Sequence, residues 1–254
     1  MMMLDIIKSW VQSRGKNNIL LHSLLSKYRR LKRYSEFYIK DTSLPEYIQL
    51  EPTTKCNCNC ITCGRKTSRS HLLKKDLSLD EFKRIISEIP SLKTVQLQGI
   101  GEPLMCDNFE EIIVYGLSKG IIFNTNSNAT LLDDHNIDFV LKHFKVFNIS
   151  FDSMIKENFE KIRIGADFDK IVHNIKRLIA RKKELGAETR IVLYFVVTHR
   201  NYNELPLFFD FCENIGAEAE IRECMHWLWM NPEHKEYSEV TDFINSCRSV
   251  RDDI

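Results

Sequence analysis

From residue 45 onward, short runs of strand-forming residues alternate with stretches of helical periodicity, and this alternation limits the possible folds more than any other feature. Six runs have strand character: 47–50, 94–97, 121–124, 146–151, 190–197 and 219–221. Helical patterns lie between them, near 79–89, 108–118, 132–143, 168–185 and 203–215. Strands that alternate with helices form βαβ units with a parallel sheet and right-handed crossovers. The sequence therefore predicts an α/β fold, either an open, incomplete barrel of six βα units or a doubly wound sheet.

Several of these helices carry their own start and stop signals. Ser78 is followed three residues later by Glu81, which is the spacing of a capping box. Asp167 precedes the longest helical stretch, and Gly186 and Gly216 stand where two helices should end. In either predicted fold, side chains that do chemistry should gather at the carboxyl ends of the strands.

Residues 1–44 differ from this pattern and predict an N-terminal arm of two amphipathic helices, near 3–13 and 18–35. The second helix carries a basic cluster at 27–33. That cluster is either a solvated face or a docking surface for an acidic partner, and residues 1–35 could also contact a membrane surface peripherally. The predicted organisation is an arm at 1–44, a main domain at 45–224 and a C-terminal tail or helix at 225–254.

Composition excludes several classes of protein. The 254 residues carry a net charge of +1, so no global field favours nucleic acid as a partner. The chain has no run of 18 apolar residues that would predict a transmembrane helix, and no clear signal peptide. Four of its eight cysteines fall within eight residues, which is unlike a disulfide framework. In a reducing, cytoplasmic compartment, such a cluster indicates a metal site.

The cysteine cluster lies in the loop that follows the first strand. Cys56, Cys60 and Cys63 have the spacing C-x₃-C-x₂-C, and Cys58 lies between two of them. Three thiolates on a short loop can hold three irons of a 4Fe–4S cubane and leave the fourth iron open. Structural zinc remains an alternative, although its cysteine pairs are usually far apart in sequence. A cluster ligated entirely by the protein, for electron transfer, is a further alternative.

The loop and the Glu51-Pro52-Thr53 segment before it resemble the radical S-adenosylmethionine (SAM) superfamily. The resemblance spans about residues 45–224. Within the superfamily, the sequence most resembles the branch of maturases whose members carry C-terminal SPASM or twitch domains. It implies a partial (β/α)₆ barrel of the radical SAM type, here with an N-terminal helical arm. It also implies that the metal ligands are Cys56, Cys60 and Cys63, with Cys58 pointing elsewhere.

The same resemblance assigns SAM-binding roles to residues after the later strands. Gly99, Gly101, Glu102 and Pro103 follow the second strand, where the family has a Gly-Gly-Glu-type motif that holds the SAM amino group; Ile100 departs from that motif. The remaining assignments are Asn126 after the third strand, Ser150 and Asp152 in a ribose-binding Ser-x-Asp, Arg163 for the SAM carboxylate, and Thr62 near the adenine. Taken singly, Ser150 and Arg163 look like ordinary turn and helix residues, but their order along the chain favours the family.

The implied chemistry begins with a reduced 4Fe–4S cluster that passes one electron to SAM. The 5′-deoxyadenosyl radical that results would take a hydrogen atom from the substrate, while the protein positions the reactants and excludes water. By family analogy, a flavodoxin or ferredoxin supplies the electron. The implied substrate is a peptide or protein, and a sugar or small metabolite is the alternative. A non-catalytic iron–sulfur or zinc protein is the rival from a different class.

A few residues have weaker claims to a role. Cys106 and Cys224 should lie near the barrel mouth, where either could donate a hydrogen atom to a substrate radical, although buried, unreactive cysteine is the commoner case. His199 could line the substrate pocket or lie in an exposed loop. Because maturases of this branch continue into a cysteine-rich domain, we expect either a compact single-cluster enzyme or a piece of a longer chain.

Overall fold

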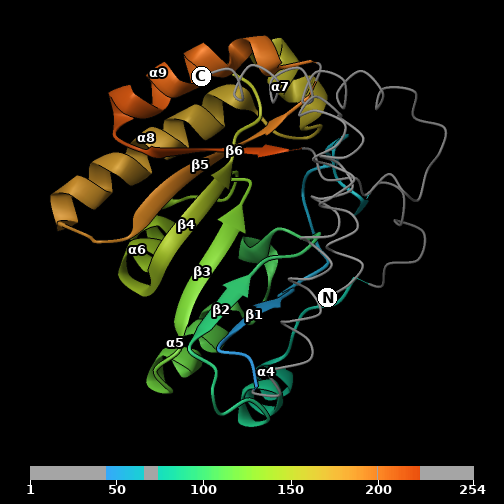
Figure 1. Cartoon of the computed structure of the whole chain (residues 1–254), viewed down its shortest axis with the longest axis vertical. Coiled ribbons are helices and arrows are strands. Elements are labelled where there is room, and N and C mark those ends of the chain that lie inside the picture. The colour runs from blue at the N-terminus through green and yellow to red at the C-terminus, as the bar shows by residue number, and fades with distance from the viewer. Residues whose placement is uncertain (1–43, 66–73, 199, 224–254) are drawn as a thin grey trace, which may run out of the picture. The chain divides into compact units, whose positions relative to one another are not determined.

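The computed structural model describes residues 44–65, 74–198 and 200–223, and from Pro45 onward they belong to one compact unit (Figure 1). The predicted tail, Cys224, His199 and, apart from Leu44, the predicted arm lie outside the described residues. The domain boundaries at 44 and 224 therefore stay predictions.

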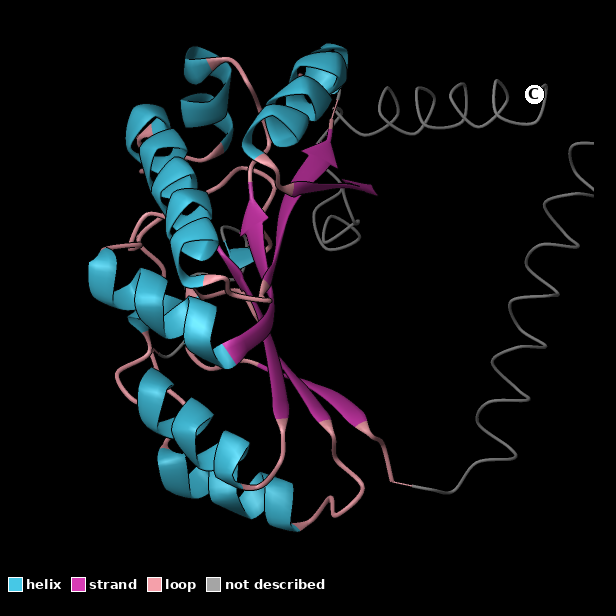
Figure 2. Ribbon diagram, turned by 90° about the vertical axis from the view of Figure 1, so that its left-hand side faces the viewer, coloured by secondary structure: helices cyan, strands magenta, loops and turns pink. Residues whose placement is uncertain are grey.

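Six parallel strands form a single sheet whose spatial order is the order of the sequence. The strands are β1 (Tyr47–Leu50), β2 (Thr94–Leu97), β3 (Ile122–Ser127), β4 (Phe144–Ser150), β5 (Arg190–Val197) and β6 (Glu218–Glu223). A doubly wound sheet reverses its strand order near the middle. This sheet has no such reversal, so right-handed crossovers keep the helices on one face, as Figure 2 shows. β1 and β6 do not pair, and the prediction of a partial barrel is confirmed.

The helices of the described chain follow the strands in turn. They are α4 (Leu79–Ser87), α5 (Phe109–Ser118), α6 (Asp134–His143), α7 (Lys156–Ile162), α8 (Phe168–Leu185) and α9 (Leu205–Ile215), with short 3₁₀ turns η2 (Pro103–Met105) and η3 (Tyr202–Glu204). The capping box is present, because the Ser78 hydroxyl accepts from the Glu81 N–H and the Glu81 carboxylate accepts from the Ser78 N–H. Gly186 and Gly216 end α8 and α9 in the left-handed conformation, as predicted. None of these helices combines the length and the apolarity needed to cross a bilayer.

The hydrophobic core lies between the sheet and its helices. Phe123, Phe147 and Phe195 project from the strands toward the helices and are fully buried. Phe208 of α9 packs on Phe195 with ring centroids 4.9 Å apart. Burial of each such side chain contributes about 2 to 3 kcal/mol, so the helix-facing side of the sheet stabilises the fold.

Two elements differ from the prediction. β3 continues to Ser127, three residues beyond the predicted end at Asn124, through a polar segment. Those residues still alternate: Thr125 points into the core, where its hydroxyl donates to the Leu97 carbonyl at 2.7 Å. The second difference is α7, which was not predicted. It is only seven residues long and its N-terminus has no side-chain cap from its own N-cap residue.

The N-terminus of α7 is instead held by Glu204, a buried residue from η3. Its carboxylate accepts from the Ser153 hydroxyl at 2.6 Å, from the Met154 N–H at 2.6 Å and from the Asn158 amide at 2.6 Å. A long-range contact therefore fixes this helix, and a local sequence pattern could not predict it.

We expect Glu204→Ala to lower the free energy of unfolding by about 3 kcal/mol, because several buried donors would lose their acceptor. Urea denaturation followed by circular dichroism measures this. Glu213→Ala, which removes an exposed carboxylate from α9, is the matched control and should stay within about 0.5 kcal/mol of the wild type. Equal stabilities of the two variants would contradict the role assigned to Glu204.

Candidate active site

A cavity of about 520 Å³ lies at the carboxyl ends of the first four strands. Its lining brings together most of the residues predicted for the site: Cys56, Cys60, Thr62, Cys63, Gly99, Gly101, Glu102, Asn126, Ser150 and Arg163. The first and the last of these residues, Cys56 and Arg163, are more than 100 positions apart in the chain. Their convergence follows from the parallel strand order, which turns every strand end toward one rim.

The cysteine loop has no regular secondary structure and is held from two sides. On one side, the Asn59 N–H donates to the Ile164 carbonyl at 2.7 Å and the Ile61 N–H donates to the Ile162 carbonyl at 2.9 Å. Gly165 stands next to this contact at φ +94°, in the region that favours glycine. The segment after α7 thus forms one wall for the loop.

The turn after β2 forms the opposite wall. The Glu102 N–H donates to the Lys55 carbonyl at 2.8 Å. A side chain at Gly101 would put its Cβ 2.0 Å from the Thr53 carbonyl oxygen, which no Cβ tolerates. Glycine at position 101 is therefore required so that the two backbones can touch. Lys55 adds ion pairs with Asp76 at 2.7 Å and Asp107 at 2.9 Å.

The four thiols of the loop differ in their electrostatic surroundings. Burial raises the pKa of Cys56 and of Cys63. A hydrogen bond from Cys58, together with the charge of Arg163, lowers the pKa of Cys60 to about 7. Of the predicted ligands, Cys60 is thus the thiol that ionises most readily.

Cys58 is buried, with 4% of its surface exposed, and it also borders the cavity. Its sulfur accepts from the Asn128 amide at 3.4 Å. Asn128 belongs to a closed ring of hydrogen bonds: its amide donates to Asn57 at 2.8 Å, Asn57 donates to Thr130 at 2.7 Å, and Thr130 donates back at 2.6 Å. Sequence reasoning missed this ring, because a pair of asparagines and a threonine has no distinctive spacing.

Glu102 is buried and has no cationic side chain in hydrogen-bonding contact among the described residues. Its carboxylate accepts from the Ser127 hydroxyl at 2.7 Å and from the Asn128 N–H at 2.7 Å. Burial raises its pKa from the ordinary 4.5 to about 7 even though these hydrogen bonds oppose the rise. Protein donors therefore occupy much of the hydrogen-bonding capacity of the Glu102 carboxylate. The Gly99–Gly101 turn borders the cavity.

Arg163 lies at the wall formed by the segment after α7 and makes a buried ion pair with Asp152 at 2.7 Å. Asp152 is fully buried, accepts from the Val196 N–H at 2.9 Å, and does not line the cavity. It therefore orients Arg163, whereas the resemblance gave it a ribose-binding role. The Arg163 Nε is buried without a partner, which leaves a cationic N–H for a carboxylate ligand.

Some predicted residues are not brought to the cavity. Pro103 begins η2 beside the cavity but does not line it. Cys106 is buried, with 6% exposed, is absent from the lining, and burial raises its pKa to about 11. This placement fits the unreactive alternative better than hydrogen-atom donation. Cys224 is outside the described residues, so its role stays a prediction.

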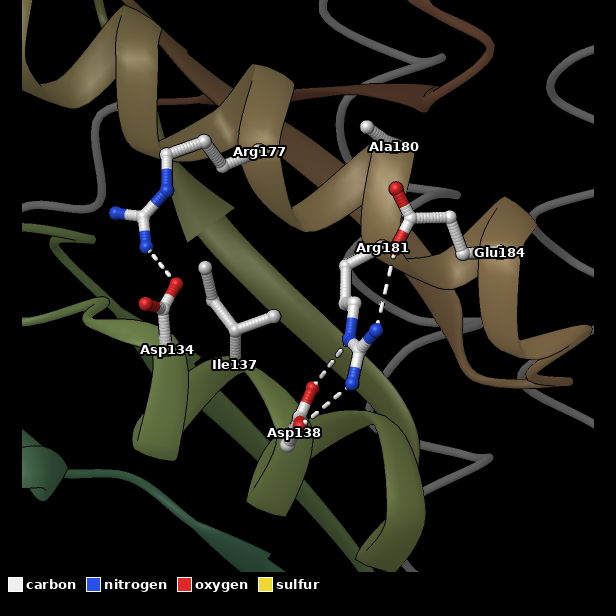
Figure 3. Close-up of a pocket in the computed structure, with 7 residues that line it drawn as sticks. All are labelled: Asp134, Ile137, Asp138, Arg177, Ala180, Arg181 and Glu184. Atoms are coloured by element: carbon white, nitrogen blue, oxygen red, sulfur yellow. Dashed lines mark hydrogen bonds and ion pairs between the residues drawn. The ribbon is translucent and has the colours of Figure 1, made fainter.

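A second pocket, shown in Figure 3, lies on the outer side of the molecule between α6 and α8. Arg181 makes a two-point ion pair with Asp138 at 2.7 and 2.9 Å, and Arg177 pairs with Asp134. Both arginines are thus already neutralised, and such exposed pairs are typical of helix–helix contacts. We assign no ligand to this pocket.

The chemistry of the donors in the main cavity fits a cluster bound together with SAM. Thiols serve as iron ligands, and an unpaired buried guanidinium N–H suits a carboxylate. Fold and site together define a partial-barrel protein with a cysteine loop lining its main cavity, although the described residues include no group of three His, Cys, Asp or Glu side chains already placed to hold a metal ion. The family model of the radical SAM superfamily matches residues 50–212, and the chain belongs to this superfamily. Its cofactors are therefore a 4Fe–4S cluster and SAM.

Curated relatives support the same family. The chain is 28% identical over 192 residues to a probable GTP 3′,8-cyclase of Methanococcus maripaludis, which covers 74% of this chain and 61% of the relative. It is 26% identical over 182 residues to a tungsten-containing aldehyde ferredoxin oxidoreductase cofactor-modifying protein of Pyrococcus furiosus, covering 69% and 50%. The chain thus spans about half to three-fifths of the length of these relatives.

Solved structures agree on the fold. SuiB of Streptococcus suis, bound to its precursor peptide SuiA, superposes with a TM-score of 0.63 at 15% identity and covers 94% of this chain and 53% of its own. The anSMEcpe structure with bound AdoMet gives a TM-score of 0.56 at 21% identity, covering 71% and 53%.

We expect Gly101→Ala to destabilise the protein by several kcal/mol, by analogy with other overpacked sites, and to lower its iron content after reconstitution. Gly99→Ala is the matched comparison, because the atoms nearest its Cβ belong to the exposed side chain of Glu51, which can move by giving up its 2.6 Å hydrogen bond from the Ile100 N–H, whereas Gly101 faces backbone. Thermal unfolding and iron analysis measure both effects. Equal losses in the two variants would show that Gly101 is not specifically required.

The raised pKa of Glu102 predicts a pH-dependent stability of the metal-free protein. The folded state binds the proton more tightly than the unfolded state, so the stabilising contribution is complete below about pH 4.5 and is lost as the pH rises through 7. The loss amounts to about 3 kcal/mol, at roughly 1.4 kcal/mol for each pKa unit. Urea titrations from pH 5 to 8 should show this slope, and Glu102→Gln should flatten it. An unchanged slope in the variant would contradict the assignment to Glu102.

Proposed function

We propose that this chain carries the SAM-cleaving domain of a radical enzyme that abstracts a hydrogen atom from its substrate. The observation that carries the proposal is that Cys56, Cys60 and Cys63 line the same cavity as Arg163, whose buried Nε has no hydrogen-bond partner in the described chain. A cluster held by these three cysteines, with SAM bound beside it, supplies a one-electron cleavage that leads to hydrogen-atom abstraction.

The roles of the residues follow from their placement. Arg163, held by Asp152, would pair with the methionine carboxylate of SAM, and the Gly99–Gly101 backbone with Glu102 would accept from its amino group. Asn126 and Ser150 at the ends of β3 and β4 offer polar groups for the ribose. Thr62, just before Cys63, would lie near the adenine. Burial of Arg163 and Glu102 excludes water and thereby strengthens these contacts.

The partners and the compartment are part of the proposal. A reductant of the flavodoxin or ferredoxin type would supply the electron, and a reducing cytoplasm would keep the four thiols of the loop available as ligands. The proposed substrate is a peptide or protein, as the solved structure of SuiB with a bound peptide suggests for a protein of the same fold. A small metabolite remains the second candidate, because several curated relatives are named GTP 3′,8-cyclase.

The test is anaerobic reconstitution with iron and sulfide, followed by dithionite and SAM. We expect four irons per chain and formation of 5′-deoxyadenosine. Cys60→Ala should lose the cluster, and Arg163→Lys should keep it while weakening SAM binding about tenfold, because a lysine offers no planar guanidinium fork. Lys142→Arg on the outer helix α6 is a matched control that should bind SAM like the wild type. If the protein binds only zinc, or binds a cluster but never forms 5′-deoxyadenosine, the alternative of a non-catalytic iron–sulfur or zinc protein is favoured.

A further inference from the structure

The sheet face that the helices leave free carries an unusual set of side chains. Because successive strand residues point to opposite faces, burial of Phe123 and Phe147 on the helix side turns Asn124 and Asn148 to the other side. Although Asn124 pairs with the apolar Val146 on β4, many of the inward positions of β1 to β4 are asparagine or glutamine. We call them the carboxamide patch: Gln49, Gln96, Gln98, Asn124, Asn126 and Asn148.

The register places these six residues in two adjoining rows. Gln49 pairs with Gln96 and Gln96 with Asn124 across the first three strands, while Asn126 pairs with Asn148 one row nearer the rim. Gln49, Gln98 and Asn126 also line the main cavity. The patch is therefore the floor that continues from the proposed SAM site into the barrel interior.

The hydrogen bonds within the patch leave both donors and acceptors unused. Gln96 donates to Asn126 at 2.9 Å and Asn148 donates to the same oxygen at 2.7 Å, so the Asn126 acceptor is filled. The Asn126 amide donates to no group of the described chain. The side-chain oxygens of Asn124 and Asn148 are buried without a partner. Asn148 is also buried as a whole residue, with 3% of its surface exposed. A buried acceptor without a donor costs about 1 to 3 kcal/mol, which indicates that a ligand supplies the donor.

The charged side chains described on the inner face of β5 and β6 do not favour a phosphorylated ligand at the patch. The arginines at inward positions of β5 and β6 are both neutralised: Arg190 pairs with Glu218 at 2.8 Å, and Arg222 pairs with Glu220 and lies over the Tyr194 ring at 4.6 Å. Phosphate recognition relies on available arginine or lysine donors. The described inner face offers neutral amides instead.

The size of the carboxamide patch further limits which ligands could bind to it. It crosses four strands, which are about 4.8 Å apart, and so spans about 14 Å. An extended peptide rises about 3.4 Å per residue, so four residues would cover it. Each peptide unit presents one N–H and one carbonyl, and a carboxamide can pair with both.

We propose that the carboxamide patch binds the backbone of an extended, neutral peptide segment and thereby positions the substrate below SAM. This inference rests on the proposed function and specifies its substrate class. The side-chain oxygens of Asn124 and Asn148, which have no partner in the described chain, accept from peptide N–H groups. The substrate residue that loses hydrogen is then set by the distance from the patch to the rim.

The test uses the reconstituted protein with its oxidised cluster and SAM, so that binding is measured without turnover. The probe is N-acetyl-tetra-alanine N-methylamide, and saturation-transfer difference NMR measures its half-saturating concentration. GTP is titrated in parallel as the phosphorylated small-metabolite alternative. We expect saturable binding of the peptide, and a half-saturating concentration that rises about tenfold in Asn148→Leu and in Asn124→Leu, because an apolar side chain of similar shape cannot accept from the peptide N–H groups.

The matched control is Asn214→Leu, which makes the same change at an exposed position of α9 and should bind the probe like the wild type. Asn124 is only half-buried, so its variant carries the test if Asn148→Leu fails to fold. A half-saturating concentration of the peptide that neither substitution changes would overturn the proposal. So would binding of GTP alone, or binding of neither probe, which would mean that SAM or another segment of the chain fills the patch. Formation of 5′-deoxyadenosine is scored separately, so a failure of the proposed function is distinguishable from a failure of this inference.

Discussion

The site depends on the contact of the cysteine loop with two walls of backbone. The loop itself has no helix or strand to fix it, and a cubane requires three thiols at set positions. Backbone hydrogen bonds to Ile162 and Ile164 hold one side, and the Glu102 N–H with the side-chain-free surface of Gly101 holds the other. Because both walls are main chain, their positions depend little on side-chain rotamers. These contacts fix the backbone of the loop, while its thiols are not yet gathered into a metal-binding group in the described part of the chain.

The parallel sheet explains why these walls meet. Each βα unit returns the chain to the same edge, so the turn after β2 and the segment after α7 both reach the cysteine loop. The buried pair Arg163–Asp152 extends this frame to β5, since Asp152 also accepts from Val196. Asn201 continues it by donating to the Asp152 carbonyl at 2.6 Å. A cationic group at the cavity is therefore anchored to β5 and the turn after it, which are far from the cysteines in sequence.

The parts of the structure that the sequence predicted are those encoded locally. The bounds of α8, β1, β2 and β5 follow from periodicity and from residues such as Asp167 and Gly186, whose preferences act within one turn. The cavity residues could be predicted because strand ends must share a rim. By contrast, α7 depends on Glu204, some 50 residues away, and the ring around Asn128 depends on Asn57, 71 residues away. No pattern within a short window records such partners. For the same reason, the sequence could name Asp152 but not its partnership with Arg163, which places it behind the cavity.

The two faces of the sheet have different roles: the helix side stabilises the fold, and the opposite side carries the polar groups. Parallel sheets are usually covered by apolar contacts on both faces, and their strands then read as nearly continuous apolar runs. Here the helix side supplies the core, with phenylalanines at successive strands, while the opposite side of β1 to β4 carries amides. A polar face costs free energy unless its groups are paired, and the oxygens of Asn124 and Asn148 are not paired within the described chain. A fold that accepts this cost on one face must recover it from what the face binds. The carboxamides therefore favour a ligand that brings its own hydrogen-bond donors, and the apolar face opposite explains how the sheet remains stable without that ligand.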